Sequence, residues 1–140
     1  MLNYHSRILG YAGLIPFIAL PFYILWGNVS YFEGISYFTQ YSAIILSFLG
    51  GILWHEGISQ NKPVKQLYWS MLPSLIGWLC LIIVPPFAAL IVLSIAFLLI
   101  LVFELRTLDS PSWYISLRVR LTAVTIGGHL MMIWLVLQNR

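Results

Sequence analysis

Five long apolar stretches, separated by short polar segments, organise this sequence. They cover residues 8–26, 38–54, 67–84, 87–103 and 117–137. A helix needs about 17–25 apolar residues to cross the hydrocarbon core of a bilayer. The spans must be helical because backbone groups find no water partners in lipid. The pattern therefore predicts an all-α integral membrane bundle of five transmembrane helices, with residues 1–140 forming one transmembrane domain.

The composition supports this interpretation and excludes several others. Charged residues make up 8% of the chain and hydrophobic residues 61%, whereas a soluble domain carries about 25% charged residues. The basic residues are scattered over separate loops, so we expect no nucleic-acid partner. Cys80 is the only cysteine, which excludes an intrachain disulfide and a cysteine-based metal site.

The positions of Lys and Arg predict the orientation of the bundle. If there are five spans, one side of the membrane holds six of these residues and the other side holds Arg140 alone. The six are Arg7, Lys62, Lys65, Arg106, Arg118 and Arg120. Because cytoplasmic loops carry the excess of basic residues, we expect a cytoplasmic N-terminus and an outside C-terminus. We expect a multi-pass protein of the cell inner (plasma) membrane.

Proline and small residues indicate how the helices connect and pack. Pro85-Pro86 predicts a tight helical hairpin between the third and fourth spans, because proline interrupts helical hydrogen bonding. Small residues let helices approach closely in lipid. They form candidate stripes on the second and fifth spans, at Ala43, Ser47 and Gly51, and at Ala123 and Gly127. The fourth span has no glycine, and we expect it to be the most peripheral helix.

His129 is the clearest ionisable residue at membrane depth, and such residues are functional candidates by default. It follows Leu117 by 12 residues, which places it about 18 Å along the helix. Ser42 and Gln40 are its candidate polar partners on the second span. One hypothesis is proton handling or ligand contact in a cavity. The other is a neutral histidine that hydrogen-bonds a neighbouring helix.

A haem held by His55 and His129 is disfavoured, because the two residues lie at different membrane depths. The sequence predicts no metal and no cofactor, and it leaves room for a bound lipid. Further candidates gather at the cytoplasmic ends of the spans. They are His55 and Glu56 beside the second span, and Glu104, Asp109, Arg118 and Arg120 around the fourth loop. Either arginine could pair with Glu104 or Asp109 while the other meets lipid phosphate.

Several segments resemble the family called domain of unknown function 3429, a group of transmembrane protein 69-like small multi-pass proteins. These segments are Gly10 to Phe17, Tyr41 to Ile52, Pro73 to Trp78, and Leu117 to Thr122. The resemblance covers most of the chain, and its most specific part is Tyr41 to Ile52. It implies a small multi-pass membrane protein, and it brings no known activity or catalytic residues.

Two functional hypotheses follow. The first is a non-enzymatic accessory, scaffold or assembly protein that packs against itself as a homo-oligomer or against a larger membrane complex. The second is a small transporter or ligand- or lipid-binding bundle with a cavity near His129. An enzyme acting on lipid ranks third, because His55, Glu56 and Asp109 form no recognisable catalytic arrangement. Membrane lipid is an expected partner in every case.

Overall fold

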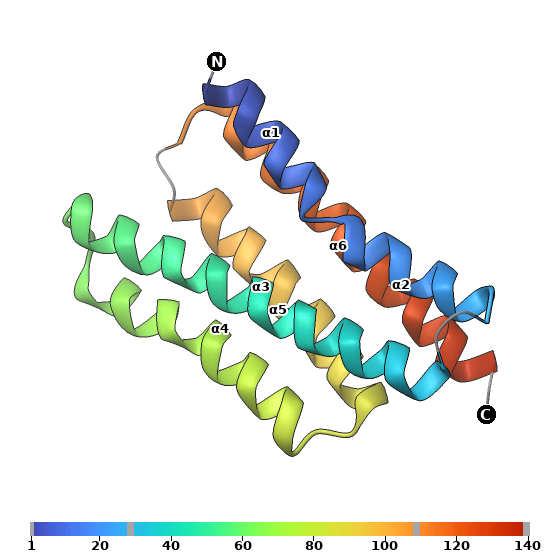
Figure 1. The fold of residues 1–140 in the computed structure, drawn as a ribbon. Helices are drawn as coiled ribbons and strands as arrows, with labels where there is room; N and C mark the ends of the chain where they lie inside the picture. Colours follow the sequence, from blue (N-terminus) through green and yellow to red (C-terminus); the bar gives the residue numbers. More distant parts are fainter. Residues whose placement is uncertain (1, 28–29, 108–109, 139–140) are drawn as a thin grey trace.

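The computed structural model describes residues 2–27, 30–107 and 110–138, and within these ranges every regular element is an α-helix. Figure 1 shows the arrangement of these helices. They are α1 (Leu2–Ala12), α2 (Ile15–Leu25), α3 (Tyr31–Ser59), α4 (Val64–Ile82), α5 (Pro86–Thr107) and α6 (Ser112–Gln138). The prediction of an all-α bundle is confirmed.

Among the described residues, four helical segments are long and apolar enough to cross a membrane. They are Tyr4–Leu25, Tyr31–Ser59, Pro86–Thr107 and Ser112–Gln138. One further long helix, α4, has 19 residues. Its first half is less apolar because it contains Lys65, Gln66 and Ser70. The fold is thus a membrane bundle with four to five helices able to span, as the five-span pattern predicted.

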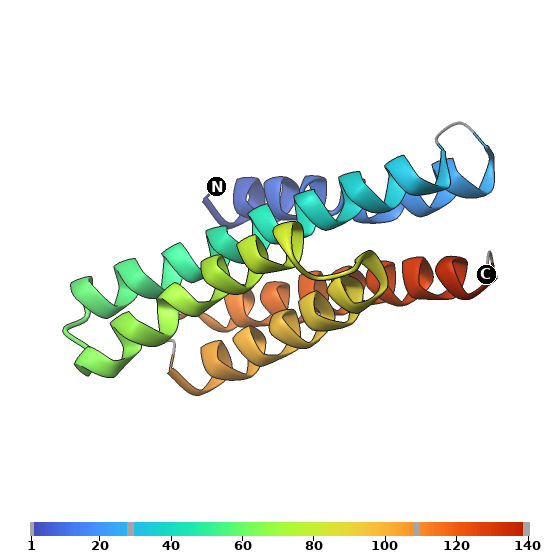
Figure 2. The ribbon, with the colours of Figure 1, turned by 90° about the horizontal axis from the view of Figure 1, so that it is seen from below.

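The long helices run side by side, and α3 lies in the middle of the bundle (Figure 1). Figure 2 shows α5 and α6 together as one layer, with α3 and α4 in the layer beside it. The N-terminal end of α1, the α3–α4 turn and the start of α6 lie at one end of the molecule. The described basic side chains therefore gather at this end.

The connection between α4 and α5 is the tight hairpin that Pro85-Pro86 predicted. α4 ends at Ile82 and α5 begins at Pro86. Proline is well suited to the first turn of a helix, since its missing N–H would have no helical acceptor there. The two helices consequently lie antiparallel and in contact with each other.

The first predicted span is two helices rather than one. α1 ends at Ala12 and α2 begins at Ile15, with Pro16 in its first turn. Pro16 has no N–H to continue the helical ladder. The hydroxyl of Tyr41 on α3 donates to the carbonyl oxygen of Gly13 at 2.6 Å. A side chain of a neighbouring helix thereby satisfies a backbone group exposed by the break.

The closest helix contacts use small residues, although at positions shifted from the predicted stripes. A Cβ added to Gly50 would lie 2.7 Å from the carbonyl oxygen of Ser70 on α4, while a Cβ on Gly51 meets nothing within 4 Å. In α6, a Cβ on Gly128 would lie 2.9 Å from the carbonyl oxygen of Phe17, and Gly127 faces open space. Of the stripe predicted on α3, Ala43 does contact α4, because a Cβ added to Gly77 would lie 3.2 Å from it. Gly51 is the wrong member, since its neighbour Gly50, about 100° away on the helix, makes the contact instead.

The expectation that the fourth span is peripheral is wrong. α5 buries eight residues, which are Ala89, Leu90, Leu93, Ala96, Phe97, Ile100, Leu101 and Glu104. It packs against α3, α4 and α6. Leucine and phenylalanine side chains fill this centre without any close backbone approach, so an absence of glycine does not indicate an outer helix.

Candidate functional site

His129 lies at the centre of the bundle, where helices α2, α3, α5 and α6 meet. Its side chain has 0% exposure. Three phenylalanine rings surround the imidazole, with ring centroids 5.6 Å away for Phe17, 4.8 Å for Phe38 and 5.5 Å for Phe97. Each ring comes from a different helix. His129 is thus held in a packed aromatic core.

Both nitrogens of the His129 ring have hydrogen-bond partners. Nδ1 lies 2.7 Å from the carbonyl oxygen of Thr125, which can only accept, so Nδ1 carries the proton. Nε2 lies 2.7 Å from Oγ of Ser42. A neutral imidazole then accepts the hydroxyl proton of Ser42 at Nε2. The predicted partner Ser42 is in place, and the pair connects α3 to α6.

Gln40, the other predicted partner of His129, does not reach it. Its side chain is exposed and its Nε2 donates to Oγ of Ser36 at 3.0 Å. The two residues are separated in angle on α3: Ser42 faces the core and Gln40 faces outward. The expectation for Gln40 was wrong because Gln40 and Ser42 are two residues apart on α3, which places their side chains on different sides of the helix.

A buried ion pair joins α5 to α6 nearer the basic end. Nε of Arg118 donates to Oε2 of Glu104 at 2.7 Å, and Nη2 donates to Oε1 at 3.1 Å. Nη1 also donates to the hydroxyl of Thr122 at 3.2 Å. The paired geometry is bidentate, the strongest arrangement of a guanidinium and a carboxylate. Both side chains are at least nine-tenths buried.

A second polar contact ties α3, α4 and α5 together. Nε2 of Gln66 donates to Oε2 of Glu56 at 2.8 Å and to the carbonyl oxygen of Leu53 at 3.1 Å. Nζ of Lys62 lies 3.6 Å from Oε1 of Glu56 and donates to the carbonyl oxygen of Thr107 at 2.9 Å. Glu56 therefore organises the turn between α3 and α4.

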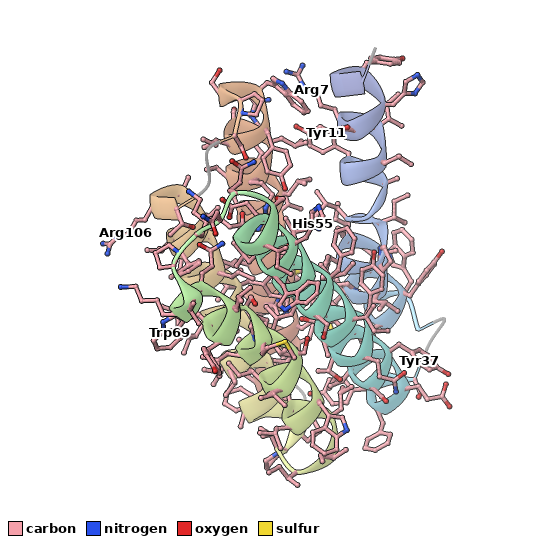
Figure 3. All side chains as sticks on the ribbon, turned by 90° about the vertical axis from the view of Figure 1, so that its left-hand side faces the viewer. Arg7, Tyr11, Tyr37, His55, Trp69 and Arg106 are labelled. Atoms are coloured by element: carbon pink, nitrogen blue, oxygen red, sulfur yellow. The ribbon has the colours of Figure 1, made fainter. Side chains whose placement is uncertain are left out.

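The remaining predicted site residues lie apart from these contacts. His55 is exposed and lines a shallow pocket of about 560 Å³ together with Glu56, Ser110 and Tyr114. Figure 3 shows His55 at the end of α3 near the basic end of the bundle. Arg120 is exposed, on the other side of α6 from Arg118. Asp109 lies outside the described residues.

Two threonines of α6, Thr122 and Thr125, share a helix face with Arg118 and His129 and were not among the predicted site residues. Arg118, Thr122, Thr125 and His129 are all at least nine-tenths buried. Their spacing of four, three and four residues could have predicted this shared position, since it places all four on one helix face. The hydroxyl of Thr125 donates to the carbonyl oxygen of Leu121, so no hydrogen bond described here joins Thr122 to Thr125. The polar face consists of two clusters and is not a continuous chain.

A pocket of about 430 Å³ lies between α1, α3 and α6. Arg118, Thr122 and Thr125 line it, as do Phe17 and Phe97, two of the rings that contact His129. His129 has no exposed surface, so these rings close it off. His129 itself therefore does not line the pocket, although the pocket lies beside two of its ring neighbours. The hydrogen bonds of His129 form a polar cross-link between helices, and the hypothesis of a binding cavity near His129 stays a prediction.

Comparison with known proteins places the chain in a family. Residues 3–135 match the model of the family described as "Protein of unknown function (DUF3429)". Transmembrane protein 69 of Xenopus tropicalis is 36% identical over 126 residues, which cover 84% of this chain and 49% of that protein. Transmembrane protein 69 of Mus musculus is 34% identical over 136 residues, which cover 91% of this chain and 54% of that protein.

The chain spans about half the length of these curated relatives. No solved structure matches it. The family match extends over all six helices, from α1 nearly to the end of α6, and the names of the relatives agree with the membrane-spanning fold. The chain belongs to the DUF3429 family of transmembrane proteins, whose function is unknown.

Proposed function

We propose that this protein is a non-enzymatic accessory or assembly protein of the membrane, acting through contact with a second copy of itself or with a larger membrane complex. The observation that supports this proposal most is that the buried ionisable groups bind one another or neighbouring helices. His129 is enclosed by three rings and two hydrogen bonds. Arg118 and Glu104 are bound to each other. These groups cross-link helices.

The outer face of α6 supports a contact with another helix. Ala123 and Gly127 are exposed, four residues apart, and a Cβ on Gly127 would meet nothing within 4 Å. Small residues at this spacing allow two helix backbones to approach closely in lipid. Leu130 and Trp134 continue the same side of the helix and are about half exposed. This surface would offer a partner helix both close approach and large apolar side chains.

Co-purification from a mild detergent at native expression tests the proposal. We expect the wild-type protein to be recovered with a partner or as a dimer, and Gly127→Leu to lose that association while remaining folded. Gly51→Leu on α3 is the matched control, because Gly51 also has open space around its Cβ position. Recovery of wild-type protein only as a solitary monomer would contradict the proposal.

We also propose that the basic end of the bundle faces the cytoplasm, in the inner (plasma) membrane. The support comes from the fold and the charges together. Arg7, Lys62, Arg106 and Arg120 lie towards the end that carries the N-terminus and the α3–α4 turn. Basic residues concentrate on the cytoplasmic side of membrane proteins. This gives a cytoplasmic N-terminus and an outside C-terminus.

A further inference from the structure

A groove follows the outer seam between α4 and α5, and its character changes along its length. Its upper part, a hollow of about 470 Å³, has the basic residues Lys62, Lys65 and Arg106 in its wall. Its lower part, of about 380 Å³, is almost entirely apolar. The two hollows share Trp69, Phe103 and Arg106, so they form one continuous groove.

The residues that line the groove are spaced so that they lie on one face of α4 and on one face of α5. On α4, Lys65, Trp69, Leu72 and Ile76 recur at intervals of four, three and four, which is one helix face. On α5, Arg106, Phe103, Leu99 and Ala96 recur at three, four and three. Each face begins with a cation, continues with an aromatic ring and ends with aliphatic side chains. Such an order matches the polarity of a bilayer from headgroup to acyl chain.

The basic side chains of this groove differ in whether they already have a polar partner within the protein. Lys62 donates to the carbonyl oxygen of Thr107 and lies 3.6 Å from Glu56. Lys65 and Arg106 are exposed and have no ion pair with any carboxylate of the described residues. Figure 3 shows Arg106 pointing away from the bundle at the edge where Trp69 lies. Two basic groups therefore remain available at the upper end of an apolar groove.

We propose that this groove binds an anionic phospholipid. The headgroup phosphate accepts hydrogen bonds from Lys65 and Arg106, and Trp69 lies beside the glycerol region. One acyl chain follows the apolar part of the groove past Leu72 and Ile76. Basic pockets between membrane helices bind anionic headgroups in this way, and a guanidinium can hold a phosphate with two hydrogen bonds.

Charge complementarity identifies the occupant as an anionic lipid and not a zwitterionic one. A choline headgroup brings its own cation next to Lys65 and Arg106 and cancels part of the attraction. A phosphatidylglycerol headgroup carries no cation and leaves the phosphate free for both side chains. Each Lys or Arg near a membrane surface contributes about fivefold to binding of an anionic lipid, so the two together give about 25-fold.

Native mass spectrometry of the purified full chain, in a detergent that retains lipids, tests this site. The probes are phosphatidylglycerol and phosphatidylcholine with identical acyl chains. We expect wild-type protein to retain phosphatidylglycerol preferentially, and the double variant Lys65→Gln with Arg106→Gln to lose about 25-fold of that preference. Equal retention of the two lipids by the wild type would overturn the proposal.

A matched control distinguishes lipid binding in the groove from a general attraction of anionic lipid to a basic surface. Arg7→Gln with Arg120→Gln removes the same charge from exposed positions outside the groove. Figure 3 places Arg7 on the other side of the bundle from Arg106. We expect this variant to keep the preference within about twofold, since exposed charges farther than a Debye length of about 10 Å are screened. A loss equal to that of the groove variant would show that the site is not the groove.

The apolar part of the groove has its own test. Leu72→Trp places an indole ring in the groove, and we expect it to lower retention of both lipids by about fourfold, since binding equivalent to roughly one buried methylene group is lost. Leu75→Trp is the control, because Leu75 is exposed on α4 and lies outside the groove. If Leu72→Trp leaves retention unchanged, an acyl chain does not occupy the groove.

Discussion

Oγ of Ser42 lies 2.7 Å from Nε2 of His129, and neither residue has any exposed surface. The two positions are 87 residues apart in the chain. Their contact fixes the register between α3 and α6 at mid-membrane. The imidazole is also hydrogen-bonded within α6, to the carbonyl oxygen of Thr125, and this second bond helps to orient Nε2 towards Ser42.

Removing this contact is expected to weaken the fold. Ser42→Ala and His129→Leu should each destabilise the protein, and a double-mutant cycle should give a coupling free energy of about 0.6–1.7 kcal/mol, the range for hydrogen bonds between membrane helices. The measurement is reversible unfolding in mixed detergent micelles. Additive effects of the two variants would mean that the hydrogen bond contributes nothing to stability.

Breaking the pair of Glu104 and Arg118 should cost more than breaking the Ser42–His129 contact. Glu104→Gln leaves the buried guanidinium without its counter-charge, and we expect a loss of about 3–5 kcal/mol. The double variant Glu104→Leu with Arg118→Met removes both charges and should recover most of that stability. Thermal unfolding in detergent compares the two, and a double variant less stable than the single one would contradict this account.

Neighbouring glycines give a sharp test of helix packing. Gly50→Ala should destabilise the protein by about 1–3 kcal/mol, because the added methyl group overpacks the α3–α4 contact. The carbonyl oxygen of Ser70 lies 2.7 Å from its position. Gly51→Ala should be neutral or stabilise by up to about 1 kcal/mol, since open space surrounds it and alanine favours the helix. Equal effects of the two variants on unfolding would place the contact elsewhere.

The orientation can be checked with single cysteines in a Cys80→Ala background. Gln60 lies in the α3–α4 turn and Ile83 in the α4–α5 connection, at opposite ends of the bundle. We expect an impermeant thiol reagent applied to intact cells to label Ile83→Cys. Gln60→Cys should react only after the membrane is opened. The reverse pattern would place the basic end outside.

Much of the fold could be predicted from the sequence because the bilayer imposes few solutions. The apolar stretches and Pro85-Pro86 were sufficient for the long helices α3 to α6 and for the hairpin, but not for the break between α1 and α2. The angular positions of residues were harder to predict. Gly50 and Gly51 are adjacent in sequence, yet one contacts α4 and the other faces open space. A single sequence does not distinguish these faces when both are apolar, because lipid and protein interior favour the same side chains.

The candidate site was predicted in part. Depth along the helices brought Ser42 to the level of His129. The charges around the fourth loop predicted that Arg118 or Arg120 pairs with Glu104 or Asp109, and the pair that forms is Arg118 with Glu104. The three phenylalanine side chains around the imidazole were not predicted. In the sequence, Phe17, Phe38 and Phe97 are indistinguishable from ordinary lipid-facing residues. Gln66 was also missed, because a single amide near a span end gives no signal until Glu56 is placed beside it.

The break at Gly13 and Leu14 gives the first membrane segment a property that α5 does not have. A continuous helix adjusts to a bilayer of different thickness by tilting as a whole. The segment Tyr4–Leu25 is interrupted between α1 and α2, so we expect the angle between these two helices to provide a second adjustment of the height that the segment spans. α2 stays fixed in the core through Phe17, while α1 packs chiefly along α6. Hydrophobic mismatch at the N-terminal end can therefore be absorbed without repacking the centre of the bundle.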